Sequence, residues 1–152
     1  MNTVTKPTIP LSIPGRIIMP YRYAVGATGS RFFVELRDNK RIMGIKCPSC
    51  KRVYVPPRST CMHCFEKLNE WVDLPAKGVL QTFTSVHYSL SVHPVPAPLM
   101  YGIVILDGAS TGLTHFISEA ETEELKIGMR MEAVFSEERK GTILDIAYFK
   151  PA

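Results

Sequence analysis

The stretch that decides the fold contains two C-x-x-C pairs, Cys47-Pro48-Ser49-Cys50 and Cys61-Met62-His63-Cys64, separated by ten residues. Two intervening residues let both sulfurs of a pair reach one ion, and two such pairs complete a tetrahedron of thiolates. The interval between the pairs is shorter than the common ribbon spacing, which indicates a compact pair of knuckles. We therefore predict one structural zinc ion, whose ligands are Cys47, Cys50, Cys61 and Cys64.

Other uses of these cysteines explain the pattern less completely. Iron in a rubredoxin-like site uses the same four thiolates and stays an alternative metal. Disulfides are typical of secreted proteins, whereas the N-terminus here has no continuous apolar segment of a secretion signal. A redox pair leaves the second C-x-x-C without a role, and His63 is not needed as a ligand beside four cysteines. Four thiolates leave zinc no position for a water, so we expect no hydrolytic chemistry at this metal.

A short helix and three short strands are predicted around the cysteines. The strands cover 41–46, 53–55 and 71–74. The helix covers about 30–40 and follows the capping oxygens of Thr28-Gly29-Ser30. Its apolar stripe consists of Phe32, Phe33 and Leu36. So short a helix is marginal alone, and we expect it to pack against the rest of the chain.

Residues 1–27 are predicted to be extended, because four prolines interrupt any helix in this segment. The segment is too hydrophobic for a solvated linker. Its large apolar side chains are Ile9, Leu11, Ile13, Ile17, Ile18, Met19, Tyr21 and Tyr23. They either fold back on their own domain or lie along a partner. Because the chain is small, we favour the second interpretation, a Pro-rich partner-docking segment.

The C-terminal half is predicted to be a five-stranded barrel. Segments rich in β-branched, aromatic and apolar residues lie near 78–88, 99–107, 112–118, 129–135 and 142–149, with turn signals between them. We expect a short helix over 118–125, where acidic residues gather at the positive end. Five strands with a helix between the third and fourth is the order of an OB-fold, although other small barrels also have five strands.

Composition places the chain among folded proteins, with 45% hydrophobic and 21% charged residues. The longest apolar run, 100–106, is too short to span a bilayer, and cytoplasm is the expected location.

The charged residues are unevenly distributed along the chain. Residues 1–70 hold twelve Lys and Arg against four Asp and Glu, whereas 71–152 hold six Lys and Arg against ten Asp and Glu. This asymmetry indicates either an anionic partner for the first half or basic side chains that only solvate its surface.

Catalytic groups are sparse in this sequence. All four cysteines belong to the metal motif, so a reaction with a cysteine nucleophile needs a second protein. The acid–base candidates are His63, His87, His93 and His115, none of which lies in a hydrolase, kinase or phosphate-loop motif. His93 lies in the loop 91–98, whose three prolines either line a ligand channel or form a rigid turn between strands. We therefore predict no catalytic residue.

A characteristic order of parts runs along about residues 22–150. The parts are Arg31-Phe32-Phe33 with Leu36, the first cysteine pair, Val55-Pro56-Pro57-Arg58, the second cysteine pair, and the segment from Trp71 to Leu80 that leads into the barrel. This order resembles the zinc-ribbon plus OB-fold accessory proteins that associate with thiolases and related acyl-CoA enzymes. The resemblance is most specific in the knuckles and the Pro-Pro-Arg link. It does not cover the residues before Tyr21.

The resemblance implies that the four cysteines bind structural zinc and that the chain docks on a thiolase-fold catalytic subunit in a hetero-oligomer. It also implies that the chain helps to shape the acyl-CoA site, while the partner supplies the catalytic cysteine. A CoA ester at the interface could meet Lys51, Arg52 or Arg58 through its phosphates. The small subunit of an aromatic acyl-CoA thiolase is one placement that fits the resemblance.

Two other functions stay open. Zinc ribbons and OB barrels occur in nucleic-acid-binding proteins, although the barrel half carries an acidic excess here. A stand-alone CoA or lipid-ester carrier, or a small enzyme that uses His93 or His115, is the third possibility. The leading prediction is a mainly β, non-catalytic accessory subunit. It has a docking segment over 1–27, a helix plus rubredoxin-like zinc ribbon over 28–76, and an OB-fold barrel over 77–152.

Overall fold

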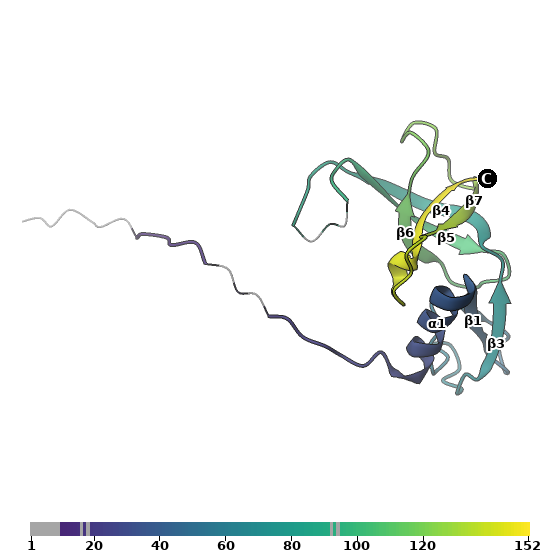
Figure 1. The fold of residues 1–152 in the computed structure, drawn as a ribbon. Helices are drawn as coiled ribbons and strands as arrows, with labels where there is room; N and C mark the ends of the chain where they lie inside the picture. Colours follow the sequence, from purple (N-terminus) through teal and green to yellow (C-terminus); the bar gives the residue numbers. More distant parts are fainter. Residues whose placement is uncertain (1–9, 16, 18, 92, 94) are drawn as a thin grey trace, which may run out of the picture.

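The computed structural model describes residues 10–15, 17, 19–91, 93 and 95–152. Figure 1 shows a helix and a small sheet packed beside a barrel, with the described part of the N-terminal segment leading away from the helix. Among the described helices, none is long and apolar enough to cross a membrane.

The first folded unit contains α1 (Gly26–Asn39) and an antiparallel sheet of three strands. The strands are β1 (Ile42–Lys46), β2 (Val53–Tyr54) and β3 (Glu70–Leu74), in the spatial order β2-β1-β3. The three strands confirm the predicted positions to within one residue.

The predicted start of α1 at residue 30 was wrong, because the helix begins at Gly26. Gly26 has a φ of 71°, a conformation that glycine adopts readily, and this lets the chain turn into the helix early. Val25 is the N-cap residue and makes no side-chain capping bond. Thr28 and Ser30 lie inside the helix, so neither has the predicted capping role. The C-terminal end lies where predicted, with Lys40 in the left-handed conformation.

The second unit is a closed barrel of five strands, which confirms the OB-fold prediction. The strands are β4 (Lys77–Val86), β5 (Leu99–Leu106), β6 (Leu113–Ile117), β7 (Arg130–Phe135) and β8 (Ile146–Pro151). Their order around the barrel is β4-β5-β6-β8-β7, and only the contact between β6 and β8 is parallel. A single 3₁₀ turn, η1 (Ile143–Asp145), precedes β8, so the last strand starts later than predicted.

The helix predicted over 118–125 is absent, and this part of the described chain consists of turns. Glu119 has a φ of 58°, which a right-handed helix does not allow. Its carboxylate accepts hydrogen bonds from the Tyr148 hydroxyl at 2.5 Å and the Lys150 ammonium at 3.2 Å. The Glu119 carboxylate therefore interacts with β8, whereas the prediction placed it at the positive end of a helix.

One hydrophobic core joins the two units. Phe32 and Leu36 of α1 are 1% and 0% exposed, as the apolar stripe predicted, and Phe33 packs against them while partly buried. The same cluster contains side chains from the ribbon strands and from all five barrel strands. Because the ribbon and barrel share this core, neither buries its apolar face alone.

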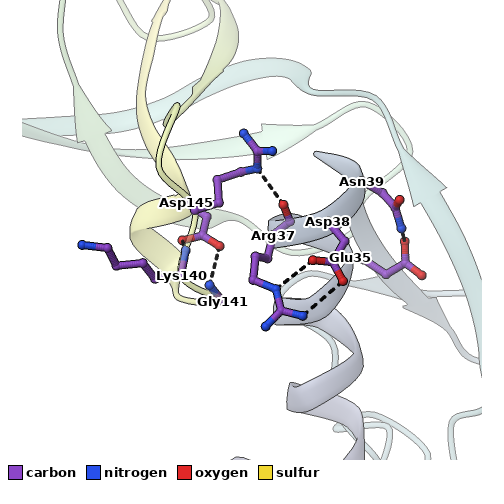
Figure 2. A network of polar contacts seen from close by, with 8 residues as sticks. Glu35, Arg37, Asp38, Asn39, Lys140, Gly141 and Asp145 are labelled. Carbon is purple, nitrogen blue, oxygen red and sulfur yellow. Dashed lines mark hydrogen bonds and ion pairs between the residues drawn. The ribbon is translucent and has the colours of Figure 1, made fainter.

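A polar network also fixes α1 to the barrel (Figure 2). The Asp145 side chain is buried and accepts hydrogen bonds from the backbone amides of Lys140 and Gly141 at 2.9 and 2.8 Å. These bonds order the loop before η1. In the same loop, the Arg139 guanidinium donates to the backbone carbonyl of Arg37 at 2.7 Å, so the ordered loop holds the C-terminal part of α1.

The described residues of the N-terminal segment up to Val25 have no helix or strand, and their apolar side chains are exposed. Leu11 is 88% exposed and Tyr23 is 74% exposed. Among the residues that the structure describes, this segment does not cover its own domain, which leaves its apolar side chains available to a partner.

Candidate metal centre

The four cysteines lie together, with every pair of their sulfurs within 4.8 Å. Cys47 Sγ lies 3.4 Å from Cys64 Sγ, and Cys50 Sγ lies 3.5 Å from Cys61 Sγ. Sulfurs at the corners of a tetrahedron with metal–sulfur bonds of about 2.3 Å are about 3.8 Å apart. The cysteines are free rather than disulfide-bonded. Their spacing therefore fits one four-coordinate metal ion.

The two knuckles have the same backbone geometry. In the first, the Cys47 amide donates to the Arg52 carbonyl at 2.8 Å, and the Lys51 amide donates to the Cys47 carbonyl at 3.1 Å. The second knuckle repeats both bonds fourteen residues later, again at 2.8 and 3.1 Å. Lys51 and its equivalent Phe65 both adopt left-handed conformations, with φ values of 62° and 59°. The sequence pairs thus form two matched turns that aim their sulfurs at one point.

Hydrogen bonds to Cys61 favour its thiolate form. The Tyr54 hydroxyl lies 3.1 Å from Cys61 Sγ, and the backbone amide of His63 donates to the same sulfur at 3.4 Å. Burial raises the pKa of Cys61, but the hydrogen bonds from Tyr54, Cys64 and His63 together outweigh burial and lower the pKa to about 5. Metals bind the thiolate form, and the Tyr54 hydroxyl is placed to stabilise that form at Cys61.

A small hydrophobic cluster surrounds the buried half of the site. It consists of Ile45, Cys47, Tyr54, Cys61 and Leu68, with Cys50 and Trp71 packed against it. Cys64 is exposed, so one side of the site faces solvent. Among the described residues, the four cysteines form the one group of three or more potential ligands that lie close enough to share a metal.

The exposed His63 and His87 and the half-buried His93 do not gather into a catalytic site. His63 lies in the second knuckle, and His87 follows β4. His93 Nδ1 accepts a hydrogen bond from the Leu90 amide at 3.3 Å, and its own amide donates to the Leu90 carbonyl at 3.0 Å. This local pairing uses the ring and the amide of His93 within one turn that starts at Leu90.

His115 is buried in the barrel, with 4% of its surface exposed. Its Nδ1 accepts from the Phe116 amide at 2.8 Å, so Nε2 carries the proton and donates to the Ile143 carbonyl at 3.0 Å. Burial lowers the pKa of His115, partly opposed by the bond to Ile143. Both ring nitrogens are used, and the side chain therefore has a structural role between β6 and η1.

The basic side chains of the ribbon are exposed, as a contact with anions requires. Arg58 places its guanidinium over the ring of Tyr54, 5.2 Å from the centroid. Lys51 donates to the Pro48 carbonyl at 2.6 Å, and Arg52 is exposed beside it. Sequence reasoning missed Tyr54 as a partner of the metal site, because only the fold brings its hydroxyl to Cys61.

Comparisons with known proteins agree with this architecture. The family model "ChsH2, rubredoxin-like zinc ribbon domain" matches residues 35–70, and "ChsH2, C-terminal OB-fold domain" matches residues 71–136. A DUF35 domain-containing scaffold protein from Methanocaldococcus jannaschii is 29% identical over 126 residues, covering 80% of this chain and 89% of the relative.

Two solved structures share the fold. The chain of the Ltp2-ChsH2(DUF35) aldolase has a TM-score of 0.65 at 21% identity, with 86% of this chain and 98% of that chain covered. A DUF35-family protein from Sulfolobus solfataricus has a TM-score of 0.62 at 23% identity, with coverage of 84% and 87%. With consecutive matches to both domains, the chain belongs to the ChsH2-type family, in which a rubredoxin-like zinc ribbon is joined to a C-terminal OB-fold domain.

Proposed function

We propose that the chain is a non-catalytic scaffold subunit of an enzyme complex. The observation that carries this proposal is the use of all four cysteines in one closed cluster. A closed thiolate site has no position for substrate, and the described histidines form no acid–base pair around it. The Methanocaldococcus jannaschii relative is itself named a scaffold protein, which supports the same role here.

The metal is proposed to be a structural zinc ion, bound by Cys47, Cys50, Cys61 and Cys64. When bound, it would supply a cross-link between the two knuckles rather than a reactive centre. The ribbon has little apolar core of its own around these residues, so metal binding and ribbon folding are expected to be coupled. The match to a zinc ribbon model supports zinc over iron.

The catalytic partner is proposed to be a thiolase-fold enzyme that acts on acyl-CoA, with this chain helping to shape the substrate site. A partner of this class supplies its own cysteine nucleophile, which this chain cannot provide. A solved structure with the same fold is named the Ltp2-ChsH2(DUF35) aldolase, which supports an enzyme as the partner of this chain. The exposed Lys51, Arg52 and Arg58 would meet the phosphates of a CoA ester.

Each segment of the chain has its own proposed role in this complex. Residues 1–27 would dock on the partner, 28–76 would form the helix and ribbon, and 77–152 would form the barrel. The exposed apolar side chains of the described N-terminal segment support its docking role. The shared core indicates that the ribbon and barrel act as one rigid body in the complex.

A C-terminally tagged chain, purified from its native cell, tests the proposal. Mass spectrometry of the co-purifying proteins should identify an acyl-CoA enzyme in stoichiometric amount. Turnover of acyl-CoA is then measured for the partner, for this chain and for both together. We expect turnover with both and none with this chain alone. Recovery of nucleic acid without any acyl-CoA enzyme would overturn the proposal.

A nucleic-acid-binding function is the second candidate, because the barrel surface carries a close pair of aromatic rings tilted by 33°. Tyr101 and Phe116 lie on β5 and β6 with ring centroids 4.6 Å apart. OB-folds bind oligonucleotides at this position, using aromatic side chains together with a positive groove. However, the two hollows beside Tyr101 are lined by threonine, aliphatic and aromatic residues and His115, without Lys or Arg. Oligonucleotide binding with steep salt dependence would favour this candidate.

A further inference from the structure

The N-terminal segment follows a two-residue repeat that its prolines do not interrupt. Odd positions from 11 to 25 hold Leu11, Ile13, Gly15, Ile17, Met19, Tyr21, Tyr23 and Val25. Even positions from 10 to 24 hold Pro10, Ser12, Pro14, Arg16, Ile18, Pro20, Arg22 and Ala24. The odd positions are apolar apart from Gly15, whereas the even positions hold all three polar residues of the stretch beside the prolines, Ile18 and Ala24. An apolar residue at nearly every second position is compatible with an extended chain that buries its odd-numbered face.

The high exposure of the described odd-numbered side chains agrees with an apolar face that no other described part of the chain covers. Leu11, Ile13 and Ile17 are 88%, 82% and 86% exposed. Tyr21 and Tyr23 have ring centroids 6.0 Å apart, so these two odd-numbered side chains lie on the same side of the chain. So many exposed apolar side chains in one stretch indicate a surface that is buried in an assembly.

The three prolines of this stretch are all even-numbered. In an extended chain, the backbone N–H and C=O groups of alternate residues point to the same edge. In an extended chain over 11–23, every odd residue therefore keeps its N–H on one edge, whereas Pro10, Pro14 and Pro20 leave gaps on the other edge only. Proline is tolerated in a strand when its position faces away from the neighbouring strand.

The segment finds no matching edge within the described part of its own chain. The barrel is closed, and the outer side of β2 is occupied by hydrogen bonds from Ser110 and Thr111. The uncovered edge of the ribbon sheet, in the described part of the chain, is β3, which has five residues and exposes Glu70 and Asp73. Charged side chains of this kind protect an edge strand from further pairing.

We propose that residues 11–23 add a strand to an open sheet edge of the catalytic partner, with the odd-numbered backbone groups paired to that edge. The inference rests on the proposed function, since it requires a protein partner. Thirteen residues in a strand span about 43 Å. The partner should offer an edge with an apolar groove beside it, because every odd side chain other than Gly15 is apolar. Backbone pairing would supply affinity, and the groove would supply specificity.

Proline substitutions in the full-length chain test the strand directly. Ile13→Pro and Tyr21→Pro remove partner-facing N–H groups, whereas the neighbouring Ser12→Pro and Arg22→Pro remove outward-facing ones. Ile13→Ala and Tyr21→Ala report the loss of the side chains alone. We expect each odd proline to weaken assembly with the co-purified partner by about tenfold more than the matched alanine. The even prolines should change the affinity by less than about twofold.

Amide hydrogen exchange in the wild-type complex gives an independent reading. Amides of Ile13, Ile17 and Tyr21 should exchange slowly, while those of Ser12 and Arg22 should exchange fast. Prolines that weaken assembly equally at odd and even positions, or at neither, would overturn the strand-addition inference alone. A wild-type chain that binds no enzyme would instead overturn the proposed function and this inference with it.

Discussion

The side-chain hydroxyl of Thr111 makes two hydrogen bonds with the backbone of Val55. It accepts from the Val55 amide and donates to the Val55 carbonyl, both at 2.9 Å. Two residues earlier along the ribbon, the Val53 amide donates to the Ser110 hydroxyl at 3.0 Å, and the Val53 carbonyl accepts from the Ser110 amide at 2.8 Å. The loop between β5 and β6 thus lies along β2 like a further strand and connects the barrel to the metal-bearing ribbon.

Removing the Thr111 hydroxyl should destabilise the junction between ribbon and barrel. Thr111→Val leaves two backbone groups of Val55 without their partner, at an expected cost of about 1–3 kcal/mol in the free energy of unfolding. Thr114→Val is the matched control, since Thr114 is exposed on β6 and should change stability by less than about 0.5 kcal/mol. Chemical denaturation of both variants measures the difference. Equal stability of the two variants would show that the Thr111 bonds contribute little.

Loss of one metal ligand should unfold the ribbon. Cys61→Ser removes a buried thiolate, and structural zinc sites contribute about 10 kcal/mol or more to folding in small peptides. We expect metal content to fall from one zinc per chain to near zero and partner binding to be abolished. Elemental analysis and co-purification measure the two effects. His63→Ala, in the same knuckle, should keep both metal and partner. A metal-free Cys61→Ser chain that still assembles contradicts this prediction.

Acid should weaken the fold through His115. Its folded-state pKa is lowered by burial, so the unfolded state binds the proton more readily than the native state does. The stability that the neutral ring contributes is therefore complete above its ordinary value of 6.5 and declines as the pH falls from there toward the folded-state pKa.

Denaturation midpoints at pH 7.5 and 5.5 measure this effect. His115→Gln should lower stability at pH 7.5 and show a smaller further loss at pH 5.5 than the native chain. His87→Gln, at an exposed position, should retain the native pH dependence. A pH dependence unchanged in His115→Gln would assign the acid sensitivity to other groups.

Replacing His93 should have a small effect on the activity of the complex. Its ring accepts from the Leu90 amide within one turn, so we expect His93→Ala to loosen the loop and to lower activity by less than about tenfold. Steady-state rates of the assembled complex with native and variant chains provide the comparison. A loss of about 10²–10⁴-fold would instead identify His93 as an acid or base in the reaction.

Sequence reasoning succeeded where local chemistry decides the structure. The C-x-x-C spacing predicted that all four cysteines lie together, as they do. Alternating apolar residues predicted the positions of the barrel strands, and in β7 the alternating Met131 and Ala133 are buried. The order of the strands then placed the chain in the correct fold class. These features depend on neighbouring residues, whose spacing is visible in the sequence.

Sequence reasoning failed where distant residues decide. The acidic stretch after β6 lacks its predicted helix, and Glu119 near its start is left-handed while its carboxylate is bonded to Tyr148 and Lys150 of β8. The contact of Thr111 with the ribbon spans 56 positions and has no local signal. The ribbon and barrel, which were predicted as separate units, share one core, since α1 packs against both. Tertiary contacts outweighed local preference in each case.

Turnover by the isolated chain tests the central claim most directly. The purified, zinc-loaded chain is assayed with acyl-CoA substrates, first alone and then with the enzyme that co-purifies from its native cell. The account predicts no turnover by the chain alone and turnover once the partner is added. Conversion of substrate by this chain, with no second protein present, would contradict the claim that it is a scaffold.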